Sequence, residues 1–458
     1  MDRPLLSTRR KTGDVLDMVA FGSLVAAGVA LPLLFWPWSA DVFVGPKFDA
    51  LRALTAIGSI ASIGYLLVEK RRVRLRTSDW AVVAFLVFNA IAFSLSVDRA
   101  TSLLGEPLQQ LGIATMFAFA GAYAIARISI RTTQRLSILI GAAAVTGTAV
   151  ALYGILQAAG LDPIWSSLPN GRAFSSIGQP NWLAGYLVIT VPLTLAIAGT
   201  ATHRILHVLG AGAALVQVAV LMATLSRSGY LGLLAAAAIA GSIAWKEGMR
   251  PPRNPGRLLA GTAIAILLVG GLLVGLSRST PTLAPVELAE RAGSALDIGG
   301  FDVGRYLALW EVGVAIAADH PLAGTGQDTY AILFPAYRDT VLEPVWAQHL
   351  AEFRPESPHN AYIALAAGMG IPALATYLLI ISGAIAAMAP YAGFSSRRSV
   401  LITGMLVAIG AHIITDWFVT IDLGGSWLFW VLMGSGLAIV DAEARRGGAR
   451  SEATQSPL

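Results

Sequence analysis

The chain has 458 residues, of which 55% are hydrophobic and only 13% are charged. Soluble domains usually carry about 25% charged residues, so this composition excludes an ordinary soluble protein and indicates that the bilayer is the solvent. The net charge of +5 does not indicate nucleic-acid binding, because the basic residues lie in short loops between apolar runs rather than on one solvated face. The absence of cysteine excludes disulfides, thiolate metal ligands and a cysteine nucleophile.

Apolar runs of about 20 residues, the length that crosses the hydrocarbon core, recur along the whole chain. We therefore predict an all-α polytopic membrane protein with about 12 transmembrane helices. The first run follows basic residues as a signal peptide would, but it is longer than the usual h-region and lacks a small-residue cleavage site, so we predict a retained helix. The predicted spans are 16–36, 50–68, 79–97, 109–127, 136–158, 181–200, 206–225, 228–245, 258–276, 359–387, 400–416 and 425–440.

The seventh and eighth spans are separated only by Ser226 and Arg227. A connector this short indicates either a very tight turn or two helices that break inside the membrane.

Lys and Arg concentrate in alternate connectors, such as the one around Lys70–Arg76. Because cytoplasmic loops retain positive charge during insertion, the alternation predicts that both termini are cytoplasmic. On this topology most of the 27 acidic residues fall on the outer side. We predict a multi-pass protein of the cytoplasmic (inner) membrane whose active site is extracytoplasmic.

One connector, residues 277–358, is far longer than the others and lies outside on this topology. Loops beyond about 15 residues usually carry their own structure or function. A helical pattern over 304–318 ends at His320 and Pro321, and a mixed aromatic and charged stretch follows it. The predicted organisation is 1–276 for transmembrane helices 1–9, 277–358 for an extracytoplasmic loop subdomain, 359–440 for helices 10–12 and 441–458 for a cytoplasmic tail.

Arg227 is the first candidate for chemistry, because almost no loop exists to solvate it and a charge at this depth is costly. One interpretation is an interfacial arginine that snorkels toward water. The other is an anion clamp, since a guanidinium presents a permanent fork of donors that fits phosphate. Backbone N–H groups at Ser228 and Gly229 would add to such a site.

Arg305 and His359 are the next candidates. Arg305 opens the predicted loop helix, where an i, i+3 ion pair with Asp302 is the alternative interpretation. His359 stands at the start of a long apolar helix, where the helix dipole favours the neutral imidazole that a general base needs. A capping or interfacial histidine is its alternative.

Other polar clusters favour non-catalytic interpretations. His203 and His207 have the spacing of metal ligands but no third ligand, and the glycines around Thr325 lack the context of a nucleotide loop. Asp416 and Asp422 are expected to be solvated acids beside an aromatic belt. No metal site is predicted.

The ordered set of motifs resembles the O-antigen ligase and O-antigen polymerase superfamily of bacterial envelope glycosyltransferases. Four patterns carry the resemblance: an asparagine-bearing helix start at 178–186, an arginine motif at 226–231, a loop arginine helix with a glycine-bearing end at 304–326, and a histidine-asparagine helix start at 357–362.

The resemblance implies a GT-C-like fold and a metal-independent, inverting transfer without a cofactor. The donor would be a glycan on a polyprenyl (undecaprenyl) diphosphate, and the acceptor a hydroxyl of lipid A core, another lipid or another glycan. Arg227 and Arg305 would bind the diphosphate, and His359 would be the general base. Arg172 and Asn181 are possible substrate-binding residues for which a structural role is equally compatible. The alternative from a different class is a secondary transporter or flippase, because twelve spans with both termini inside is also a common transporter layout.

Overall fold

The computed structural model describes residues 3–165, 172–249, 301–352, 354–422 and 424–455, and over these ranges its regular elements are all helical. The longer elements in chain order are α1 (Arg3–Leu33), α2 (Val44–Glu69), α3 (Thr77–Ser94), α5 (Ile113–Ser129), α6 (Thr133–Ala158), α7 (Pro180–Gly199), α8 (Arg204–Ala223), α9 (Arg227–Lys246), α12 (Phe301–Asp319), α13 (Tyr330–Val341), α15 (Ala361–Met388), α16 (Arg397–Thr415) and α17 (Ser426–Gln455). Shorter elements are α4 (Arg99–Leu104), η2 (Ser175–Ile177), α14 (Pro344–His349) and η3 (Ala389–Tyr391).

The predicted all-α polytopic membrane architecture is confirmed. Among the described residues, 10 helices are long and apolar enough to cross a membrane, and α5 is a shorter apolar helix. The predicted span 258–276 and the first part of the predicted loop subdomain, 277–300, lie outside the described residues. α8 ends at Ala223 and α9 begins at Arg227, so the connector between the seventh and eighth spans is a tight turn.

Many of the helices begin at a side chain that accepts backbone N–H groups. Such caps matter in a membrane protein, because the first N–H groups of a helix have no acceptor within the helix. Inside the hydrocarbon there is also no water to accept their hydrogen bonds. The capping residues are Asp98 for α4, Thr132 for α6, Gln179 for α7, Ser226 for α9, Asn360 for α15 and Ser396 for α16.

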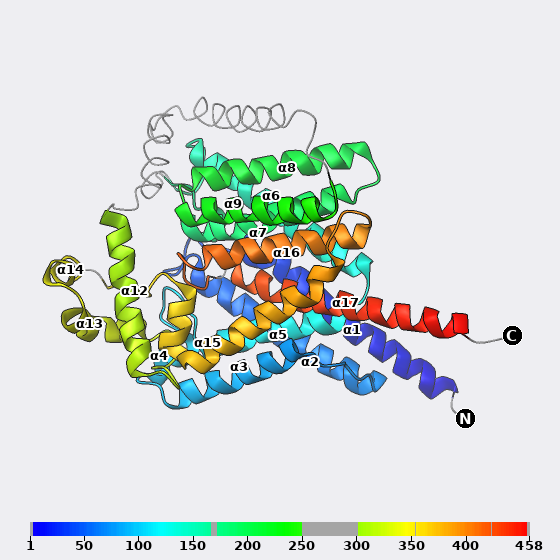
Figure 1. Ribbon diagram of the computed structural model, residues 1–458, viewed down its shortest axis with the longest axis horizontal. Helices are drawn as coiled ribbons and strands as arrows, with labels where there is room; N and C mark the ends of the chain where they lie inside the picture. Colours follow the sequence, from blue (N-terminus) through cyan, green and yellow to red (C-terminus); the bar gives the residue numbers. More distant parts are fainter. Residues whose placement is uncertain (1–2, 166–171, 250–300, 353, 423, 456–458) are drawn as a thin grey trace.

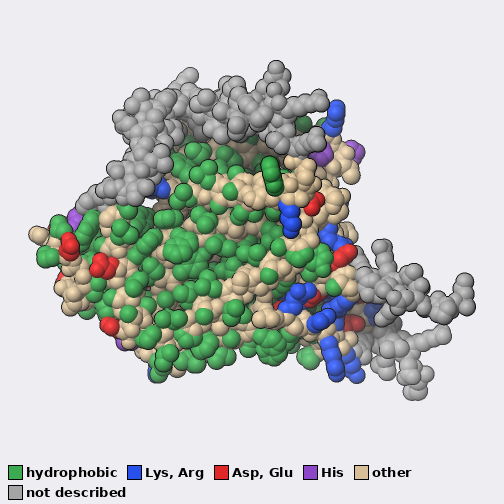
Figure 2. Space-filling model, in the orientation of Figure 1, with side chains coloured by type: hydrophobic (Ala, Val, Ile, Leu, Met, Phe, Trp, Pro, Cys, Tyr) green, Lys and Arg blue, Asp and Glu red, His purple; other side chains and the backbone are tan. Residues whose placement is uncertain are grey.

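Helices from the two ends of the sequence pack against each other. α3 lies against α15 and α5 lies against α17, while α16 packs between α7 and α9. The two chain termini lie on the same side of the bundle, on the right of Figure 1. Lys and Arg side chains gather on this side, and acidic side chains are prominent at the other end (Figure 2). We call these the terminal face and the loop face.

α15 is broken where Gly370 adopts φ +84° two residues before Pro372. Proline has no N–H to donate, so a carbonyl one turn earlier loses its partner. The turn segment 321–326 supplies donors to the carbonyls that lack a helical partner: Gly326 N donates to Gly368 O at 2.8 Å, and Thr325 N donates to Ala367 O at 3.0 Å. The glycine-bearing end of the loop arginine motif is therefore a strap that repairs a broken membrane helix.

α12, α13 and α14 form a small unit on the loop face, seen at the left of Figure 1. The predicted helix 304–318 is confirmed as α12, which ends one residue before His320. Leu309, Val312 and Ile316 on one face of α12 pack with Tyr330 and Phe334 of α13. Since α12 also packs along α15, this unit is attached directly to a membrane helix.

Candidate active site

The tight turn between α8 and α9 holds Arg227 at the first position of a helix. Ser226 caps that helix, and its hydroxyl accepts from Gly229 N at 3.4 Å and lies 3.0 Å from the Ser228 hydroxyl. Arg172 ties the turn from the other side, since its Nε donates to Thr224 O at 2.7 Å. The half-buried Arg227 guanidinium therefore projects from a backbone that is fixed on both sides.

Arg172 also joins this turn to α7. Its Nη2 donates to Asn181 Oδ1 at 2.7 Å, and Asn181 lies in the first turn of α7. Close packing of the two helices depends on Gly229, because a Cβ there would lie 2.7 Å from the Ala184 Cβ. Arg172 and Asn181 are thus bonded to each other beside the turn that bears Arg227, and we call these three residues the arginine pair site.

His359 lies just before α15, in a turn that is bound to the end of α16. Asn360 Oδ1 accepts from Tyr362 N and Ile363 N at 3.0 Å each, while its Nδ2 donates to Trp417 O at 3.2 Å. Ala361 N donates to Asp416 O at 2.9 Å. His359 itself adopts φ +51°, a strained conformation for a residue other than glycine. The imidazole is therefore aimed by a backbone that its neighbours hold in place.

Arg305 approaches His359 through the ring of Tyr306. The Arg305 Cζ lies 5.7 Å from the centroid of the Tyr306 ring, and that ring meets the His359 ring edge to face at 5.8 Å. Gly313, two turns further along α12, allows this approach because a Cβ there would lie 2.5 Å from Ile363 Cγ2. The structure brings Arg305 and His359 together from two elements. The side chain of Asp302, the alternative partner of Arg305, lies outside the described part.

The surroundings favour neutral imidazole at position 359. Burial lowers the pKa of His359 below its usual 6.5, Glu356 opposes this by favouring the charged form, and Arg305 lowers the pKa further. A histidine that is neutral near pH 7 can accept a proton.

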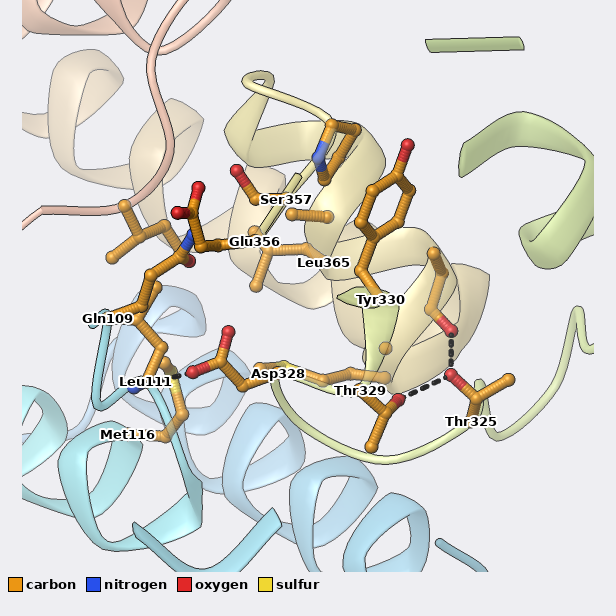
Figure 3. Close-up of a pocket in the computed structure, with 16 residues that line it drawn as sticks. Gln109, Leu111, Met116, Thr325, Asp328, Thr329, Tyr330, Glu356, Ser357 and Leu365 are labelled. Atoms are coloured by element: carbon orange, nitrogen blue, oxygen red, sulfur yellow. Dashed lines mark hydrogen bonds between the residues drawn. The ribbon is translucent and has the colours of Figure 1, made fainter. Parts of the chain in front are cut away.

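A narrow pocket lies beside this turn, lined by Glu356, Ser357, Asp328 and residues of α13 and α15. Its volume of about 30 Å³ admits one or two water molecules but no sugar ring. Figure 3 shows the Asp328 carboxylate below and Glu356 above it, with the Glu356 carboxylate turned away from Asp328. Asp328 Oδ2 accepts from Glu106 N at 2.7 Å and from Leu111 N at 3.2 Å.

Burial raises the pKa of Asp328 to about 7, although the two backbone donors lower it, and the carboxylates of Glu106 and Glu356 raise it. Near neutral pH this carboxyl therefore carries a proton part of the time. The pocket is an acidic, water-sized chamber next to the turn that bears the candidate base.

The expectation that Asp416 and Asp422 are solvated is wrong. Their exposed fractions are 2% and 3%, because the segment between α16 and α17 folds inward and is covered by the starts of α7 and α15. Asp422 Oδ1 accepts from Gly425 N at 2.7 Å. Burial raises the pKa of Asp422 to about 7, and burial together with the nearby Asp422 raises that of Asp416 well above its usual range.

The same inward segment connects the two halves of the site. α7, which carries Asn181, meets it where a Cβ at Gly424 would lie 3.0 Å from Trp182 O. The His359 turn meets it at Asp416 and Trp417. The connector thus lies beside the start of α7, which bears Asn181, and beside the His359 turn, while Arg227 and Arg305 lie near the starts of α9 and α12.

Sequence reasoning missed Asp328 and Glu356 as members of this region and dismissed Asp416 and Asp422. An acid in a polar connector has the sequence pattern of a solvated residue, and only the tertiary contacts reveal its burial. Among the described residues, no group of three His, Asp or Glu side chains lies close enough together to hold a metal ion.

Comparison with known protein families gives one finding. Residues 211–378 match the family model described as O-antigen ligase. The matched range contains α9 with Arg227, α12 with Arg305 and the turn before α15 with His359. This match confirms the resemblance for the three motifs that it contains, at 226–231, 304–326 and 357–362, whereas the motif at 178–186 lies outside the matched range. No curated protein matches the chain.

Proposed function

We propose that this chain, a multi-pass membrane protein whose residues 211–378 carry an O-antigen ligase domain, transfers a glycan from a polyprenyl diphosphate carrier to a hydroxyl acceptor. The reaction would take place at the loop face, which we propose is the extracytoplasmic face of the inner membrane. The observation that carries the proposal is the pairing of a neutral histidine with a permanently charged arginine, linked through the Tyr306 ring.

The proposed reaction is a single displacement. The acceptor oxygen forms a bond to the anomeric carbon, and its proton passes to His359. The bond from that carbon to the diphosphate oxygen breaks, and the diphosphate leaves with the electron pair. One displacement at the anomeric carbon inverts its configuration.

Arg305 and Arg227 would bind the diphosphate and stabilise the negative charge that grows on it. Two guanidiniums can supply this charge at any physiological pH, because arginine is not deprotonated in proteins. We therefore propose a transfer that needs no metal. Turnover that persists in excess EDTA is expected.

Arg172 and Asn181 take a positioning role in this proposal. Arg172 donates to Thr224 O and to Asn181 Oδ1, so it holds the turn that bears Arg227 against α7. Loss of Arg172 should weaken donor binding through misplacement of Arg227.

The test is transfer by the purified full-length chain in detergent, with a lipid-linked glycan donor and a hydroxyl acceptor. His359→Ala should lower kcat by about 100-fold to 10,000-fold, the usual contribution of a general base, while donor binding remains. His320→Ala makes the same chemical change at an exposed position beyond α12 and serves as the control.

Equal turnover by His359→Ala and the control would reject the role of His359. Ion-gradient-dependent uptake into sealed vesicles without any bond formation would instead support a secondary transporter or flippase.

A further inference from the structure

The terminal face contains a basic pocket between α2, α5 and α17, far from the candidate active site. Its volume is about 210 Å³, and its apolar lining comes from Leu66, Val73, Ile128 and Ala438. Five arginines line it against a single aspartate: Arg71, Arg72, Arg127, Arg131 and Arg445 against Asp441. Insertion explains why basic residues lie on this face, but it does not explain why they converge on one pocket.

Two of these arginines build the wall of the pocket. Arg127 bridges two acids, with its Nε 3.2 Å from Asp79 Oδ1 and its Nη2 2.5 Å from Asp441 Oδ2. Arg131 pairs with Asp17 and stacks on the ring of Tyr65, 4.7 Å from its centroid. These contacts fix α2, α5 and α17 relative to one another.

Arg72 and Arg445 stand at the mouth of the pocket and are exposed. Within the part of the chain that the structure describes, neither guanidinium forms an ion pair with an acid. Two such groups beside one opening give it a positive charge that no ion pair among the described residues compensates. A phosphate diester would accept hydrogen bonds from both.

An apolar groove begins where the basic pocket ends. Leu66, Val73, Arg127 and Ile128 line both cavities. The groove has a volume of about 460 Å³; α2 and α3 form its walls, and α5 forms its floor with small residues, among them Gly121 and Ala124. A charged pocket that continues into an apolar groove matches the two parts of a phospholipid, a charged headgroup and an apolar acyl chain.

We propose that this pocket and groove bind one anionic phospholipid, with its phosphate at Arg72 and Arg445 and an acyl chain along α5 between α2 and α3. Basic pockets between membrane helices bind the headgroups of acidic lipids in this way. Free inorganic phosphate would satisfy the arginines but would leave the apolar groove empty, so the groove favours the lipid.

The test is lipid binding to the purified full-length chain in detergent, measured by native mass spectrometry with phosphatidylglycerol and phosphatidylcholine. Phosphatidylglycerol should bind more tightly. Each of Arg72→Gln and Arg445→Gln should weaken it about fivefold, and the double variant about 25-fold, from the usual attraction per basic residue. Arg204→Gln removes the same charge from an exposed position at the start of α8 and is the matched control.

Ala124→Phe tests the groove, because the added ring would fill its floor while the arginines remain. It should weaken phosphatidylglycerol binding while the affinity for inorganic phosphate stays unchanged. Equal binding of the two lipids, a double variant that behaves like Arg204→Gln, or complete displacement of the lipid by millimolar phosphate would each overturn the proposal. Because no step of glycan transfer enters this assay, its failure would leave the proposed enzymatic function untouched.

Discussion

Asn360 is the residue whose replacement should reveal how the His359 turn is held. Its side chain is buried and makes three hydrogen bonds, two as the cap of α15 and one to Trp417 O. Replacement by alanine removes the cap, which costs about 1 kcal/mol, and leaves a carbonyl without its donor, which costs about another 1 kcal/mol. The expected loss is about 2 kcal/mol, or roughly 30-fold in the ratio of folded to unfolded protein.

Asn360→Ser separates the contribution of the helix cap from that of the hydrogen bond to Trp417 O. Serine can cap the helix but is too short to reach Trp417 O, so about half of the lost stability should return. Reversible unfolding in mixed detergent micelles, followed by circular dichroism, gives the free energies. In the transfer assay both variants should lose kcat more than donor affinity, because the arginine pair site lies on other helices. An alanine variant as stable as the wild type, or a serine variant no better than alanine, would refute this account.

Two further predictions concern the same region. The acid limb of the pH profile of kcat/KM should move in opposite directions in two variants. Glu356→Gln removes a charge that raises the pKa of His359, so the limb should move to lower pH. Arg305→Gln removes a charge that lowers the pKa of His359, so the limb should move to higher pH. Limbs that stay in place, or move together, would contradict the assignment of His359 as the titrating base. Gly313→Ala should push α12 away from Ile363 and lower kcat. Gly241→Ala, at an exposed position of α9 where a Cβ would meet nothing within 4 Å, should have no effect on turnover. Equal rates for the two variants would contradict the packing argument.

The membrane architecture could be predicted from sequence because hydropathy and span length are local properties. α12 followed from helical spacing. For the short join before Arg227, the sequence left a tight turn and a break inside the membrane as alternatives, and the structure has the tight turn. The spacing that predicts α12 depends only on residues close together in the chain, which is why the sequence pattern was sufficient for that helix.

The acidic surroundings of the site could not be predicted in this way. Asp328 is buried because Glu106 and Leu111, more than 200 residues earlier, donate to it. Asp422 is buried because a connector folds inward instead of outward. Nothing in the local composition of either segment distinguishes it from a solvated loop, since the deciding contacts come from other helices.

The repaired break in α15 limits how the loop unit can be exchanged between related proteins. The strap 321–326 belongs to the chain that leaves α12, yet its N–H groups complete the hydrogen bonding of Ala367 and Gly368 inside a membrane helix. A graft of the loop unit alone would place the strap of one protein against the α15 kink of another. The two carbonyls at the kink would then be left without hydrogen-bond donors in the membrane. A viable chimera should therefore take its junction beyond Pro372, so that the strap and the kink it repairs are inherited together.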